Sequence, residues 1–68
     1  MNTKNNSDDI SYRLLEELNK ESKVSQRALA DRLGIALGLV NAYIKRLCKK
    51  GYIKSKFLPR NRIKYIVV

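Results

Sequence analysis

Hydrophobic residues at helical spacing begin the patterned part of the chain. Ile10, Leu14 and Leu18 recur every four residues and therefore share one face of a helix. Ser7 or Asp8 is placed to cap this helix, because a short polar side chain accepts hydrogen bonds from the free N–H groups of the first turn. We therefore predict an amphipathic first helix that starts beside these two residues.

Two further helical patterns meet at a single glycine. Leu29 and Leu33 share a face of a helix predicted over residues 26–33, and Ser25 is its predicted cap. Gly34 supplies the left-handed backbone conformation that ends a helix and turns the chain sharply. The second helix is thus expected to lead through a tight turn into a third.

The third helix is predicted over residues 36–50, with Gly51 as its left-handed cap. Val40 and Leu47 lie at the centre of the face that we expect to be buried. The opposite face has neither an acidic nor a large apolar residue. It carries Gly38, Asn41, Ala42, Lys45 and Lys49.

Beyond Gly51 the pattern changes to a period of two, which is typical of strands. Pro59 and Asn61 mark a turn between two such segments, so a hairpin with Arg60 and Arg62 at its tip is predicted. The side chains expected to point inward are Ile53, Ser55 and Phe57 on the first strand and Ile63, Tyr65 and Val67 on the second.

Two short helices joined at a glycine, with the small Ala30 at their crossing, form the helix-turn-helix arrangement. With the K-K-G-Y-I segment at residues 49–53 and the hairpin after it, the chain resembles the winged helix-turn-helix domain of MarR-like bacterial transcriptional regulators, particularly the exopolysaccharide-associated type. The resemblance covers residues 10–68 and implies a small α+β fold, with three helices plus a two- or three-stranded antiparallel wing. A third strand would form at Val24. The pattern is carried by Leu29, Ala30, Leu33, Gly34, Ile35 and Val40.

The length of 68 residues allows one domain with a single small core. We predict a disordered tail over residues 1–7 and the winged helix-turn-helix domain over residues 8–68. Fifteen basic residues against six acidic ones give a net charge of +9, and residues 32–68 contain no acidic residue. A field of one sign over half of a small domain indicates a polyanionic partner.

The composition also argues against other kinds of protein. The chain has no histidine and a single cysteine, Cys48, so it lacks both the usual general base and the ligands of standard zinc sites. No apolar run reaches the length of a membrane span, and the N-terminus is too polar for a signal peptide. We expect a cytoplasmic protein that is not an enzyme and uses no cofactor or metal, with Cys48 acting as a small half-buried hydrophobe.

The resemblance implies double-stranded DNA binding in transcriptional regulation, with the helix at 36–50 in the major groove and the wing at 57–63 on the backbone or in the minor groove. Because specific operators usually need two copies, we also expect a homodimer on DNA. The residues expected to face bases are Gly38, Asn41, Ala42 and Lys45. Those expected on the backbone or in the minor groove are Ser25, Arg27, Arg46, Lys49, Lys54, Lys56, Arg60, Arg62 and Lys64.

Two alternatives stay open. One is recognition of left-handed DNA or double-stranded RNA by backbone shape. Winged helices that bind left-handed DNA are similar in an asparagine at Asn41 and a proline in the wing at Pro59, but this chain has Lys45 where they carry an aromatic residue, and it has no tryptophan in the wing. A protein-interaction winged helix would instead use Leu37 and Leu39 to bind a partner.

Overall fold

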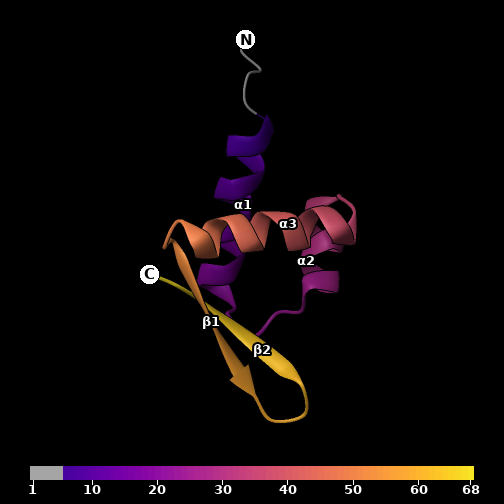
Figure 1. Ribbon diagram of the computed structural model, residues 1–68. Coiled ribbons are helices and arrows are strands. Elements are labelled where there is room, and N and C mark those ends of the chain that lie inside the picture. The colour runs from indigo at the N-terminus through magenta and orange to yellow at the C-terminus, as the bar shows by residue number, and fades with distance from the viewer. Residues whose placement is uncertain (1–5) are drawn as a thin grey trace.

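The computed structural model describes the backbone of residues 6–68 and the side chains of residues 9–68 (Figure 1). It has the predicted α+β architecture of three helices and a two-stranded antiparallel sheet. Figure 1 shows α3 crossing α1, with α2 beside the start of α3 and the hairpin extending away from the helices. In chain order the elements are α1 (Asn6–Lys20), α2 (Gln26–Leu33), α3 (Leu37–Lys49), β1 (Ile53–Leu58) and β2 (Arg62–Val67).

The first helix starts earlier than predicted. α1 begins at Asn6, so Ser7 and Asp8, the two predicted caps, lie inside its first turn. An acidic residue is favourable there as well, because the N-terminal end of a helix carries partial positive charge. Of the predicted tail over residues 1–7, residues 1–5 lie outside the described part of the chain.

Both predicted glycine turns are present. Gly34 has a φ angle of 70°, and its N–H donates to the carbonyl oxygen of Ala30 at 2.8 Å. Gly51 has a φ angle of 86°, and the N–H of Tyr52 after it donates to the carbonyl oxygen of Leu47 at 2.9 Å. Because a side chain at such an angle costs about 1–2 kcal/mol, the two glycines fix where α2 and α3 end.

Of the two- or three-stranded wing that was predicted, the two-stranded form is present, and no third strand forms at Val24 within the described residues. Val24 is buried in the loop between α1 and α2 but belongs to no strand. That loop contacts the sheet through one backbone hydrogen bond, from the N–H of Tyr65 to the carbonyl oxygen of Ser22, at 3.0 Å. The hairpin is therefore tied to the helices beside α2, which holds it close to the helix-turn-helix.

The hydrophobic core lies between the three helices and the base of the hairpin. The helical stripes predicted from spacing are the ones that are buried, but the strand rows differ. Phe57 was expected to point inward with Ile53, yet its side chain is 79% exposed, because the hairpin continues beyond the helices (Figure 1). The buried core consists of Leu14, Leu18, Val24, Leu29, Ala30, Leu33, Val40, Tyr43, Ile44, Leu47, Ile53 and Tyr65.

The second and third helices begin with different caps. The hydroxyl of Ser25, the cap of α2, accepts a hydrogen bond from the N–H of Ala28 at 3.0 Å. Ala36, the cap of α3, has the same extended backbone angles, but its methyl side chain cannot accept a hydrogen bond. We expect Ala36→Ser to raise the free energy of unfolding by about 1 kcal/mol, measured by urea unfolding. Ala42→Ser within α3 is the matched control and should not stabilise, because serine is the poorer helix former. Equal effects of the two changes would contradict this explanation.

Candidate nucleic-acid interface

The residues predicted to face bases occupy two places on α3. Gly38, Ala42 and Lys45 are exposed on the side of the helix that points away from the core. Asn41 is half-buried on the flank of α3, where it lines an open groove with residues of the hairpin. Asn41 therefore lies at the edge of the exposed surface that Gly38, Ala42 and Lys45 form.

Asn41 belongs to a chain of hydrogen bonds that the sequence does not reveal. Its amide nitrogen Nδ2 donates to Oε1 of Gln26 at 3.2 Å, and Nε2 of Gln26 donates to the hydroxyl of Tyr65 at 2.8 Å. The three residues come from α3, the first turn of α2 and β2. Gln26 was not predicted as a site residue, because its partners lie 15 and 39 positions away in the chain.

A groove of about 520 Å³ separates α3 from the hairpin. It brings together three of the predicted contact residues, Asn41, Lys45 and Lys49, with Gln26 and Tyr65 of the hydrogen-bonded chain. Cys48 also reaches the groove, and burial raises the pKa of its thiol, as is typical of a cysteine that packs as a hydrophobe. The groove is lined by Gln26, Asn41, Ile44, Lys45, Cys48, Lys49, Ser55, Ile63 and Tyr65.

A second groove, of about 280 Å³, lies between the start of α2 and the hairpin turn. Its rim holds Ser25 and Arg62, two residues predicted to contact the DNA backbone, and Lys23 beside them. Arg27 is exposed in the first turn of α2. The N-terminal end of α2 and the base of the turn therefore present their polar and cationic groups to the same space.

The remaining predicted cations lie elsewhere. Arg46 is on the opposite flank of α3 from Asn41, with its guanidinium 5.0 Å from the ring centroid of Tyr43. Lys54 and Lys56 alternate with the inward row of β1, so they occupy the face of the hairpin that points away from the groove. Lys64 is paired with Lys56 in the sheet and shares that outer face.

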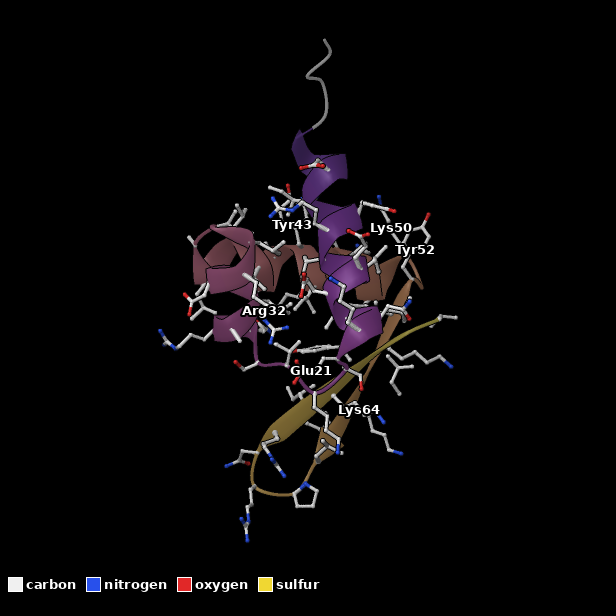
Figure 2. All side chains as sticks on the ribbon, turned by 180° about the vertical axis from the view of Figure 1, so that it is seen from behind. Glu21, Arg32, Tyr43, Lys50, Tyr52 and Lys64 are labelled. Carbon is white, nitrogen blue, oxygen red and sulfur yellow. The ribbon has the colours of Figure 1, made fainter. Side chains whose placement is uncertain are left out.

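Two acidic residues, Glu17 and Glu21, form ion pairs with Arg32. Figure 2, seen from behind, shows Arg32 of α2 reaching toward Glu21. Arg32 contacts Glu21 at 3.1 Å and Glu17 at 3.3 Å, and the hydrogen bond with Glu21 is the largest cause that raises the pKa of its guanidinium. These ion pairs offset charge on that side and leave the positive charge concentrated around α3 and the hairpin.

Residues 6–68 are the part of the chain that the structure describes. Within this described part, no three histidine, cysteine or acidic side chains come close enough together to hold a metal ion. No helix in the same residues has the length and apolar character needed to cross a membrane.

The fold and this surface define a winged helix-turn-helix protein. Residues 7–54 match the model of the winged helix-turn-helix DNA-binding family, and the chain belongs to that family. It is also similar to an uncharacterised protein of Methanocaldococcus jannaschii, with 37% identity over 54 residues. The match covers 79% of this chain, but the chain spans only 19% of the length of that relative.

Proposed function

We propose that this chain binds double-stranded DNA as a transcriptional regulator, with α3 in the major groove and the wing, residues 57–63, on the backbone or in the minor groove. The observation that carries the proposal is the exposed, acid-free side of α3, which stands beside the hairpin across an open groove. A B-DNA major groove is about 12 Å wide and accepts one helix of this kind.

The surface of α3 fits close approach to a duplex. Gly38 and Ala42 are small residues on the exposed side. No described atom of a neighbouring residue would lie within 4 Å of a Cβ atom placed at Gly38. Lys45 supplies a cation that can reach a guanine acceptor or a phosphate. Within residues 9–68 the side-chain amide of Asn41 makes one hydrogen bond, through Nδ2, and an adenine edge would be read by its second amide hydrogen and its carbonyl oxygen.

Backbone contacts are proposed on both sides of this helix. Ser25 and Arg62 share the groove beside α2, Lys49 lines the groove beside the hairpin, and Arg60 is exposed at the hairpin tip. Arg27 and Arg46 are proposed to reach the flanking phosphates, and the cations of the outer hairpin face, Lys54, Lys56 and Lys64, to add backbone contacts of their own.

The proposal has three finer parts. The MarR-like regulator of the exopolysaccharide-associated type rests on sequence resemblance, the homodimer on DNA on the two copies that specific operators usually need, and the cytoplasmic location on composition. The spacing through Gly34 and the K-K-G-Y-I segment at residues 49–53 support the MarR-like type. A protein-interaction function is the second candidate, favoured by Leu37 and Leu39, which are 39% and 42% exposed at the start of α3.

The test separates base reading from backbone contact. Asn41→Ala should lower the preference for adenine at one or two positions by about 1–3 kcal/mol and leave binding to unrelated duplexes nearly unchanged. The measurement is selection from a random pool of duplexes, followed by dissociation constants for the selected site and its single-base variants.

Lys49→Ala is the matched comparison, because it removes a cation from the same helix. It should weaken binding to every sequence by a similar factor, since phosphate contacts carry no sequence information. If the pool yields the same motif with and without the Asn41 side chain, the base-reading role is wrong.

A further inference from the structure

Gln26 lines both grooves, together with Ile63 and Tyr65. It is half-buried in the first turn of α2, beneath the flank of α3 that carries Asn41. A neutral side chain in this position would add nothing to the electrostatic attraction for DNA. Its two hydrogen bonds instead connect the side chain of Asn41 to that of Tyr65.

We infer that Gln26 is a positioning residue that fixes the side-chain amide of Asn41 in the orientation needed to read one base. This inference rests on the proposed function, because it concerns how α3 discriminates between sequences. The bond at 3.2 Å engages one of the two amide hydrogens of Asn41. Reading adenine would use the other hydrogen and the carbonyl oxygen, for which no partner is found among residues 9–68.

The anchor of this arrangement is rigid. Tyr65 is 5% exposed, and its backbone N–H is bonded to the carbonyl of Ser22. Its hydroxyl accepts the amide hydrogen of Gln26 at 2.8 Å, so both ends of the glutamine amide are held. The orientation of Asn41 is thus connected through Gln26 to the strand that leads out of the hairpin.

We expect this arrangement to improve discrimination between base pairs and not the overall electrostatic affinity for DNA. An unrestrained asparagine on a helix surface loses rotamer freedom when it binds a base, whereas a pre-oriented one has already lost it. The cost of immobilising one such side chain corresponds to roughly three- to tenfold in affinity for the correct base. We expect Gln26→Met, which preserves the shape without the hydrogen bonds, to lower discrimination at the Asn41 position by about that factor.

Gln26→Glu is the conservative variant that separates the two effects. Its carboxylate accepts from both the Asn41 amide and the Tyr65 hydroxyl, so the orientation of Asn41 is kept. Its negative charge near the phosphates should weaken binding to all sequences. The two variants therefore change different quantities: methionine lowers discrimination at one base pair, and glutamate lowers affinity while discrimination persists.

The experiment combines binding with a measurement on the free protein. Dissociation constants for the selected site and its variants are measured for the unmodified chain, Gln26→Met, Asn41→Ala and the double variant, which together form a cycle. In the free protein, the NMR order parameter of the Asn41 side-chain amide should be lower in Gln26→Met than in the unmodified chain. Tyr65→Phe should lower it in the same direction by less, without disturbing the packing of the ring.

The inference is supported if Gln26→Met loses discrimination only when Asn41 is present and the order parameter falls. An equal loss with and without Asn41 would show that Gln26 contacts DNA itself and would overturn it. An unchanged order parameter would overturn it on structural grounds alone. If the unmodified chain selects no motif, the proposed function fails and this inference fails with it, an outcome that the first binding measurement identifies.

Discussion

Leu47→Ala should lower the free energy of unfolding by about 2–5 kcal/mol, because it leaves a cavity that the surrounding side chains fill only in part. Leu47 is 4% exposed on the buried stripe of α3, within the core shared by the helices and the base of the hairpin. A domain of this size has a total stability of only about 5–15 kcal/mol, so the change removes a large share of it. Thermal or urea unfolding monitored by circular dichroism measures the loss.

Leu39→Ala is the matched control for this change. It removes the same atoms from the same helix, but the side chain of Leu39 is 42% exposed. We expect a loss within about 0.5 kcal/mol, since surface substitutions away from special features have small effects. Similar losses for the two leucines would mean that the buried face of α3 has been misassigned.

The helices could be predicted because the spacing of their hydrophobic residues follows the face that is buried. α2 has the predicted bounds, and α3, at Leu37–Lys49, is one residue shorter at each end than predicted. The stripe through Val40 and Leu47 is buried as the period of 3.6 requires. The predicted inward rows of the strands were correct only near the helices, where Ile53 and Tyr65 are buried, whereas Ser55 and Phe57 on β1 are exposed. Alternation alone does not say how far a hairpin extends past the core. Phe57 is exposed for this reason.

The candidate site was less predictable, because its key contacts join residues far apart in the chain. Asn41 was recognised from its residue type and position on α3. Its bond to Gln26 depends on how α2 and α3 cross, which no local pattern contains. Alternation likewise predicted that Lys54 and Lys56 share one face of the hairpin. It did not predict how that face is oriented relative to α3.

The hairpin turn shows a conformational cost that the sequence did not indicate. Arg60 has a φ angle of 67° and Asn61 one of 58°. Asparagine tolerates this left-handed region, but an arginine there costs about 1–2 kcal/mol. A strained residue with a long cationic side chain at the exposed tip favours a role in binding, since strain of this kind is often kept at functional sites.

The dependence of DNA affinity on salt should show the largest effect of all. The proposed surface offers nine cations, of which about five or six can meet phosphates, so log K should fall against log salt with a slope of about −4.5 to −5.5 per protomer. Between about 50 and 200 mM salt, affinity should therefore drop roughly a thousandfold. Fluorescence anisotropy with a labelled duplex of random sequence measures the slope. The cations are Arg27, Lys45, Arg46, Lys49, Lys54, Lys56, Arg60, Arg62 and Lys64.

Paired charge removals then locate the contacts. Replacing Arg60 and Arg62 by alanine should make the slope shallower by about one to two units, because both residues border the hairpin turn. The control replaces Arg13 and Lys20 on α1, which lies behind α3 (Figures 1 and 2), and should leave the slope nearly unchanged. A third variant replaces Lys54 and Lys56, which lie on the outer face of β1, by alanine. Its slope reports whether that face of the hairpin also contacts the DNA backbone.

The outcomes of these arms distinguish three physical situations. A slope near zero for the unmodified chain would contradict nucleic-acid binding and favour the protein-interaction function through Leu37 and Leu39. Equal losses from the hairpin pair and the α1 pair would show that the net charge of +9 acts diffusely, without a defined wing contact. A loss confined to the hairpin would place a phosphate or minor-groove contact at its tip. The direction in which α3 enters the major groove would then follow, because the base of the hairpin is tied to the helices by the backbone bond between Tyr65 and Ser22.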